Sequence, residues 1–269
     1  MRIRLKSERE LALMRQASAL VVDTLRLLRD RVRPGVTTAE LDRLAEAYIR
    51  SRGGVPSFKG YRGFPASACI SVNDQVVHGI PGPRRLEEGD IVKVDIGALV
   101  GGYHGDAAIT LPVGAVSPAA TALMAHTYGS LLAGIAAARA GNRLGDISCA
   151  VQRHAERQGY SVVRELVGHG IGRDMHEDPP VPNCGHPGRG PLLVPGMTLA
   201  IEPMINEGGP AVNEPSDEWT YTTADGRLSA HFEHTVAIGR NGPEVLTRWP
   251  YGEEPVCAGL PAAPALRAG

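Results

Sequence analysis

Residues 91–111 read IVKVDIGALVGGYHGDAAITL. Valine and isoleucine recur on both sides of a glycine pair, Gly101-Gly102, and this pattern predicts a β-hairpin. If Val100-Gly101 is the two-residue turn, Asp95 and Asp106 lie directly across from each other on one face, with Cβ atoms about 4.5–5.5 Å apart. The hairpin therefore predicts two neighbouring carboxylates.

Two carboxylates that face each other destabilise a sheet unless a proton or a cation lies between them. Oxygen ligands in this arrangement are typical of sites for divalent cations. The alternative is a slipped register, in which one aspartate lies in the turn and both are solvated. For a lone pair of aspartates near a hairpin, the slipped register is the more common arrangement.

Two further acids favour the metal site. Glu202 lies in TLAIEPM and Glu233 in HFEHTVAIG, and both segments are predicted to be apolar strands. Burial of a lone glutamate inside such a strand destabilises the fold by roughly several kcal/mol unless the carboxylate is paired or bound to a cation. With Asp95 and Asp106 these acids carry four negative charges, which two divalent ions would balance. A single zinc ion would need fewer acids, so the count predicts a two-metal centre.

A glycine-rich stretch, GHGIGRDMHEDPP (168–180), contains His169 and His176. It is not an HExxH zinc motif, because Pro180 stands where the second histidine is required and the prolines break the helix. Its glycines predict a closely packed, irregular turn that holds His169 near the strands. A lone histidine is usually a structural hydrogen-bonding group. Here the acids need a ligand that adds no charge, and this favours His169 as a ligand.

Four helices are predicted along the chain. The first two begin at capping boxes, SERE (7–10) and TTAE (37–40), and the other two span roughly 117–138 and 144–158. The segment RPGVTTAEL that contains the second box is similar to RAGNRLGDI further along the chain. This similarity predicts two related halves around a shared sheet. The expected boundaries are 1–250 for a single catalytic domain, about 5–113 and 114–250 for its halves, and 251–269 for an Ala- and Pro-rich tail.

The overall composition indicates a globular protein of the cytoplasm. Of its 269 residues, 43% are hydrophobic and 21% charged, and the formal net charge of −1 gives no broad attraction to nucleic acid or to a membrane. The opening MRIRLKSEREL lacks the apolar segment of a secretory signal. The 4 cysteines form no CxxC pair, a pattern that suits a reducing compartment.

The chain resembles the type I methionine aminopeptidases, which have the pita-bread metallopeptidase fold. The resemblance covers about residues 5–250 and implies an α+β fold of two pseudo-symmetric halves, with helices packed on a curved, mainly antiparallel sheet. The motifs that carry it are CISVNDQVVHGIP (69–81), VKVDIG (92–97), GYHGDAAIT (102–110), GHGIGRDMHEDP (168–179), IEPM (201–204) and HFEHT (231–235).

The same resemblance implies the residues of the site. Two divalent ions (Co, Mn, Fe, Ni or Zn) are expected, and Asp106 and Glu233 are expected to bridge them. Glu202 is implied as general base and proton shuttle. Of His78 and His176, one would contact the scissile carbonyl or the tetrahedral oxyanion, and the other the scissile amide nitrogen. The implied metal ligands are Asp95, Asp106, His169, Glu202 and Glu233.

A pocket for a methionine side chain is also implied by the resemblance. Sulfur atoms and aromatic faces suit a thioether, because both are polarizable. For Cys69 or Met175 taken singly, an ordinary place in the core is an equally good interpretation. The pocket residues implied are Tyr61, Phe64, Cys69, Met175 and Trp219.

The activity implied is that of a methionyl aminopeptidase. It would remove the N-terminal methionine from peptides and nascent chains by means of a metal-bridged hydroxide, with a preference for a small second residue. We expect a cytoplasmic monomer that makes at most transient contact with the ribosome and has no stable nucleic-acid or membrane partner.

Two alternatives stay open from the sequence. One is a proline-specific aminopeptidase or dipeptidase of the same fold, although such enzymes usually carry an additional N-terminal domain, for which we expect no room before Ser7. The other is a pita-bread binding module without catalysis, although such proteins usually lack several ligands.

The chain also has Ala107-Ala108-Ile109-Thr110 after the second aspartate, where many family members have a run rich in serine and threonine.

Overall fold

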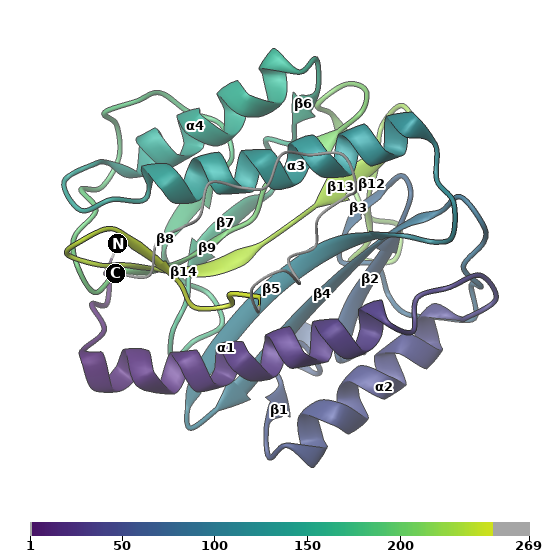
Figure 1. The fold of residues 1–269 in the computed structure, drawn as a ribbon, viewed down its shortest axis with the longest axis horizontal. Helices are drawn as coiled ribbons and strands as arrows, with labels where there is room; N and C mark the ends of the chain where they lie inside the picture. The colour runs from purple at the N-terminus through teal and green to yellow at the C-terminus, as the bar shows by residue number, and fades with distance from the viewer. Residues whose placement is uncertain (1, 250–269) are drawn as a thin grey trace.

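The computed structural model describes residues 2–249. Figure 1 shows α1 and α2 along one side of the molecule, α3 and α4 along the other, and the strands between them. The helices are α1 (Glu8–Arg29), α2 (Thr38–Ser51), α3 (Pro118–Ala137) and α4 (Leu144–Arg157), with a short 3-10 helix at Tyr61–Gly63. The strands are β1 (Val55–Pro56), β2 (Ala68–Val72), β3 (Gln75–Val77), β4 (Ile91–Val100), β5 (Tyr103–Pro112), β6 (Ser161–Val162), β7 (Val167–Gly170), β8 (Glu177–Pro182), β9 (Thr198–Ile201), β10 (Met204–Asn206), β11 (Val212–Asn213), β12 (Tyr221–Thr223), β13 (Ser229–His231), β14 (His234–Ile238) and β15 (Pro243–Val245).

The first two helices begin where the capping boxes predict. The Ser7 hydroxyl accepts a hydrogen bond from the backbone N–H of Glu10, and the Glu10 carboxylate accepts one from the backbone N–H of Ser7 at 2.9 Å. Thr37 and Glu40 make the same reciprocal pair at the start of α2. Each box satisfies backbone donors that a helix start leaves free, so the local sequence fixes these two boundaries.

Each helix pair is associated with one of the two larger sheets. α1 packs against β4 and β5, in a sheet where β4 lies between β1 and β2 and also pairs with β5. α3 and α4 contact strands of the second sheet, whose order is β15-β14-β9-β7-β8, and of a three-stranded sheet, β13-β10-β6. We propose on this basis that the domain consists of two halves that meet near residue 113. The predicted tail, 251–269, lies outside the described residues.

The β4–β5 hairpin forms, but the predicted turn is wrong. Val100 pairs with Tyr103, so the turn residues are Gly101 and Gly102 rather than Val100 and Gly101. Both glycines have positive φ, at 59° and 81°, as the tightest hairpin turns require. A β-branched valine is strongly disfavoured in that region of backbone space, and this explains the shift.

The corrected register changes how the two aspartates face each other. Asp95 lies opposite Ala108, and Asp106 lies opposite Gly97. The two carboxylates are therefore diagonal neighbours on one face, not a directly opposed pair. Diagonal neighbours are still within reach of a shared ligand, because their Cα atoms are only about 7–8 Å apart.

Threonine side chains also join β5 to the segment that runs from the end of β13 into β14. The Thr235 hydroxyl of β14 accepts from the backbone N–H of Asp106 at 3.1 Å and donates to its carbonyl at 2.8 Å. The Thr110 hydroxyl makes the same pair of bonds with the backbone of His231. The backbone N–H of Glu233 donates to the Ala108 carbonyl at 2.9 Å. These bonds hold the segment around Glu233 beside Asp106.

Candidate metal centre and active site

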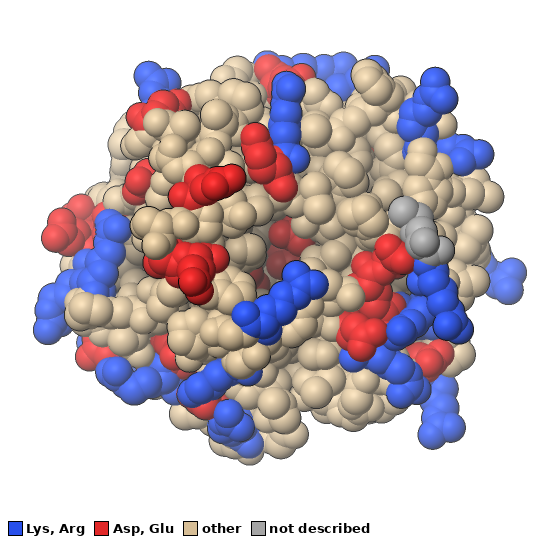
Figure 2. All heavy atoms as spheres, turned by 180° about the vertical axis from the view of Figure 1, so that it is seen from behind, with Lys and Arg blue, Asp and Glu red and all other residues tan. Residues whose placement is uncertain are grey.

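The five predicted metal ligands come together from both halves of the chain. All of them line one cavity of about 160 Å³. Figure 2 shows acidic side chains at the base of a hollow in the face opposite to that of Figure 1. Asp95 lies on β4, Asp106 on β5, His169 on β7, Glu202 directly after β9, and Glu233 between β13 and β14.

The two glutamates do not lie inside strands as the sequence predicts. Glu202 directly follows Ile201, the last residue of β9, and Glu233 lies two residues after His231, the last residue of β13. Pro203 after Glu202 has no N–H to continue a ladder. The interruption leaves both carboxylates free to turn toward the cavity.

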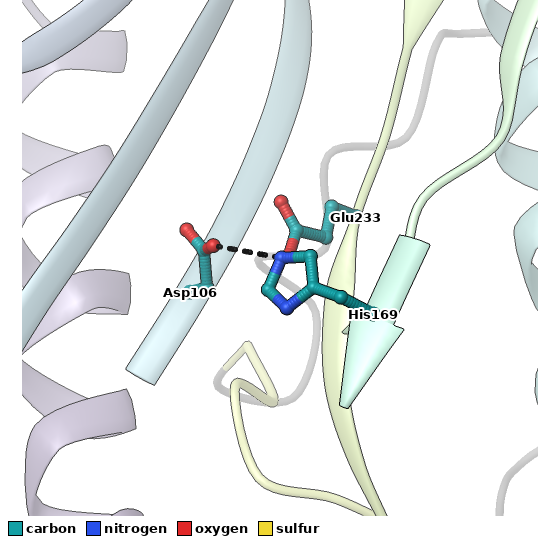
Figure 3. Close-up of side chains that lie close together, drawn as sticks. All are labelled: Asp106, His169 and Glu233. Atoms are coloured by element: carbon teal, nitrogen blue, oxygen red, sulfur yellow. Dashed lines mark ion pairs between the residues drawn. The ribbon is translucent and has the colours of Figure 1, made fainter. Parts of the chain in front are cut away.

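Asp106, His169 and Glu233 point toward one another (Figure 3), and each offers a ligand atom within 4.8 Å of the other two. The Nε2 atom of His169 is 3.8 Å from Asp106 Oδ2 and 3.6 Å from Glu202 Oε1. These gaps are too long for hydrogen bonds. They match two atoms that each bind the same ion at about 2.0–2.2 Å.

Three carboxylate oxygens in the cavity have no hydrogen-bond partner although they are buried. They are Asp95 Oδ1, Asp106 Oδ1 and Glu233 Oε1. Buried polar atoms are nearly always paired, so three orphaned oxygens in one cavity require an explanation. A bound cation supplies it, because it would satisfy all three and offset their charge. The donor set therefore fits a metal site.

The acids of the cavity hold protons more tightly than isolated carboxyls. Burial raises the pKa of Asp95 to about 7. Burial also raises the pKa values of Asp106, Glu202 and Glu233 well above the usual range, and the charges of neighbouring acids raise them further. Concentrated negative charge of this kind is stable at neutral pH only with protons or cations among the oxygens.

His169 is prepared to act as a neutral ligand. Its Nδ1 atom lies 2.8 Å from the carbonyl oxygen of Gly170, which can only accept, so Nδ1 carries the hydrogen and Nε2 presents its lone pair to the acids. Burial lowers the pKa of His169 to about 4. The predicted irregular turn is wrong, because His169 lies within β7 and pairs with Ala200. The predicted close packing is present: a Cβ on Gly168 would lie 2.3 Å from the Ala200 oxygen.

His176 lies beside the acids but on the open side of the cavity. Its ring is 4.1 Å from the ring of His169 and is stacked on Tyr61, with centroids 5.2 Å apart. Its Nδ1 is 2.9 Å from the Tyr61 hydroxyl. Desolvation by the surrounding protein, with smaller contributions from His169 and Arg62, lowers the pKa of His176 to about 3. The imidazole is therefore neutral at physiological pH.

His78 approaches the cavity from the segment that follows β3. Its backbone has a positive φ of 58°, which is uncommon for a residue other than glycine. Its ring makes edge contacts with Trp219 and Tyr221 at centroid distances of 6.5 and 6.2 Å. Burial lowers the pKa of His78 to about 4, so it too is neutral.

The predicted methionine pocket is a compact cluster next to the acids. Phe64, Cys69 and Met175 are at most 5% exposed, and Tyr61 and Trp219 pack against them. Sequence reasoning missed Ala66, Ile80 and one aromatic member, Phe58. The signal was the local aromatic content, since two of the chain's 3 phenylalanines fall within residues 58–64.

His231 is a second residue that sequence reasoning gave no role. It is buried, and its Nε2 lies 3.7 Å from Glu202 Oε2 without a hydrogen-bond partner. Glu202 is thus flanked by the Nε2 atoms of two histidines, His169 on one oxygen and His231 on the other. In the segment HFEHT, His231 stands two residues before Glu233, which gives no sign of a contact with Glu202. The ring of His231 reaches Glu202 because β13 ends at this residue.

Comparison with known proteins identifies the family. The family model of "Metallopeptidase family M24" matches residues 12–240. The chain belongs to metallopeptidase family M24. The family binds divalent metal, in agreement with the orphaned oxygens of the cavity.

The similarity of this M24 peptidase to its relatives covers most of its length. It is 56% identical over 243 residues to the methionine aminopeptidase of Clostridium perfringens, covering 90% of this chain and 98% of the relative. The crystal structure of methionine aminopeptidase from Rickettsia prowazekii superposes with a TM-score of 0.91 at 41% identity, covering 92% of this chain and all of that one. The predicted resemblance and the pita-bread fold are confirmed.

A proline-specific peptidase shares the fold at lower similarity. An Xaa-Pro dipeptidase from Bacillus anthracis superposes with a TM-score of 0.74 at 22% identity. The superposition covers 91% of this M24 peptidase and 62% of the dipeptidase. At this identity the likeness concerns the fold alone.

Proposed function

We propose that this M24 metallopeptidase removes the N-terminal methionine from peptides and nascent proteins. One observation carries the proposal: a pocket of sulfur and aromatic groups, with Cys69, Met175 and Phe64 buried in it, lines the same cavity as the acids. Such groups suit the thioether of methionine. Relatives with the printed name methionine aminopeptidase support the same activity.

The proposed metal content is two divalent ions per chain. Asp95, Asp106, His169, Glu202 and Glu233 would hold them, with Asp106 and Glu233 shared. The mixture of carboxylate and imidazole ligands suits Co, Mn, Fe, Ni or Zn. When bound, such ions would supply an acidified water for attack and would polarise the scissile carbonyl.

The chain's own residues complete the proposed reaction. Glu202 moves a proton from the attacking water toward the leaving amide nitrogen, a role that suits a carboxyl whose pKa burial and the charge of Asp95 raise well above its usual range. The Tyr61 hydroxyl lies 2.9 Å from Nδ1 of His176, and in the proposed tautomer it donates to Nδ1, so that Nε2 of His176 carries a hydrogen and stabilises the developing oxyanion. His78, which lines the same cavity, would contact the scissile amide nitrogen.

The proposed setting is a cytoplasmic monomer that meets its substrates as free peptides or nascent chains, with transient contact at the ribosome. No helix within residues 2–249 is long and apolar enough to cross a lipid bilayer. The preference for a small second residue is part of the same proposal.

The proposed specificity is tested with three peptides at equal concentration: Met-Ala-Ser, Met-Lys-Ser and Ala-Pro-Ser. We expect Met-Ala-Ser to be cleaved at least about 100-fold faster than either of the others, judged by kcat/KM, since each mismatched group forfeits a few kcal/mol of transition-state binding. Release of the first residue is followed by liquid chromatography. Faster cleavage of the Ala-Pro peptide would replace the proposal with a proline-specific activity, and cleavage of none would favour a binding module.

A further inference from the structure

A buried ion pair lies beside the segment that carries His176. The Glu177 carboxylate, one residue after His176, lies 2.5 Å from the Nζ atom of Lys6. The two side chains are 3% and 5% exposed. The ion pair between Arg4 and Asp174 is far more exposed, with side chains 47% and 61% accessible. Removal of one partner from a buried pair is strongly destabilising, because it leaves the other charge buried without compensation.

The same carboxylate shapes the β7–β8 loop (residues 171–176). Its Oε1 accepts hydrogen bonds from the backbone N–H groups of Arg173 at 2.9 Å and Asp174 at 3.4 Å, while Oε2 faces Lys6. The fit is tight at Gly172, where a Cβ would lie 2.5 Å from Lys6 Cε and 2.7 Å from Glu177 Oε1. The loop conformation therefore depends on the position of the Glu177 carboxylate.

The N-terminal segment, residues 2–6, anchors this arrangement to the rest of the fold. The backbone N–H of Lys6 donates to the Gly196 carbonyl at 2.7 Å, and its Nζ also donates to the Arg4 carbonyl at 3.1 Å. The backbone N–H of Arg2 donates to Asp178 Oδ2 at 2.6 Å. The segment thus runs along the β7–β8 loop and is itself fixed to the segment before β9.

The loop held in this way carries two residues of the proposed active site. Met175 is 2% exposed and belongs to the methionine pocket, and His176 contacts Tyr61 and the ring of His169. We infer that Lys6 and Glu177 are positioning residues, whose buried ion pair holds His176 in the geometry needed for turnover. The inference rests on the proposed function, and it makes the N-terminal segment part of the active-site architecture.

The inference predicts that the pair acts through His176. Lys6→Met leaves Glu177 buried without its main counter-charge, so the carboxylate and the loop must shift toward water. Glu177→Gln keeps the shape and an oxygen acceptor for the two backbone N–H groups but removes the ionic contact. Each change is expected to lower kcat for Met-Ala-Ser about ten- to a hundred-fold, because a displacement of about 1 Å costs that much at a positioned catalytic group.

The test compares each variant in two backgrounds, with His176 present and with His176→Ala. A positioning residue affects turnover only through the residue that it positions. Lys6→Met and Glu177→Gln should therefore lower kcat by less than about two-fold in the His176→Ala background. A purely structural role would give the same fold-loss in both. Metal content, measured by elemental analysis, should equal that of the unaltered protein, because the ligands lie outside the loop.

Asp174→Asn is the matched control. It removes an ion pair between the same N-terminal segment and the same loop, but an exposed one, and exposed pairs contribute little. Its kcat should stay within about two-fold of the unaltered protein. The inference would be overturned if Asp174→Asn and Glu177→Gln lowered kcat equally. It would also be overturned if Glu177→Gln lowered kcat by the same factor in both backgrounds, or did not lower kcat at all. If Lys6→Met proves insoluble, Glu177→Gln alone decides. A His176→Ala variant with normal kcat would instead refute the role proposed for His176.

Discussion

Replacement of Asp106 by asparagine is expected to lower hydrolysis of Met-Ala-Ser by more than about a thousand-fold. Loss of one group that stabilises the transition state already costs about a hundred- to a thousand-fold, and Asp106 is proposed to hold both ions. Its Oδ1 is a buried oxygen without a partner, and its Oδ2 faces His169. An amide cannot supply the charge that a bridging ligand needs, so metal content should fall as well.

The Asp106→Asn variant should nevertheless fold. Burial and the charges of Asp95 and Glu202 raise the pKa of Asp106, so ionised Asp106 destabilises the metal-free fold at neutral pH. A neutral side chain removes that repulsion, and the metal-free variant should unfold at the same temperature as the metal-free parent or a higher one. Asp23→Asn, on the exposed face of α1, is the control and should change neither metal content nor activity. Normal hydrolysis by Asp106→Asn would refute the two-metal site.

Replacement of His176 by alanine is expected to lower kcat about a hundred- to a thousand-fold while both metals stay bound. His176 contacts the Tyr61 hydroxyl and faces the open side of the cavity, whereas its neighbour His169 presents Nε2 to the acids. A group that acts in the transition state alters kcat and kcat/KM together and leaves ground-state binding nearly unchanged.

Steady-state kinetics with Met-Ala-Ser and elemental analysis of the purified variant separate two roles for His176. Loss of turnover with full metal content supports contact with the substrate. Loss of one ion would instead make His176 a metal ligand. Tyr61→Phe offers a milder comparison, because it removes only the hydroxyl that lies 2.9 Å from Nδ1 of His176.

The features predicted best from the sequence are those that depend on nearby residues. The boxes at Ser7 and Thr37 fix helix starts because their hydrogen bonds span only three residues. The β4–β5 hairpin was predicted for the same reason, although its turn was misplaced by one residue. The turn requires two residues with positive φ, and only the Gly101-Gly102 pair meets that requirement without strain.

The features that escaped prediction depend on contacts between distant segments. Glu202 and Glu233 lie at strand ends, and His231 turns toward Glu202, because β13 and β14 are separated beside β5. Lys6 and Glu177 are 171 positions apart, and no local pattern links them. The roles of individual ligands came from resemblance to a family, since a constellation of acids indicates a metal site but does not assign its members.

The central claim is that catalysis depends on two divalent ions held among Asp95, Asp106, His169, Glu202 and Glu233. It is tested most directly by stripping the protein of metal and following hydrolysis of Met-Ala-Ser while Co, Mn, Fe, Ni or Zn is added back. We predict negligible activity in the stripped protein, recovery on addition of metal, and a binding stoichiometry of two ions per chain by calorimetry. Full activity in the stripped protein, or binding of metal that restores none, would contradict the claim.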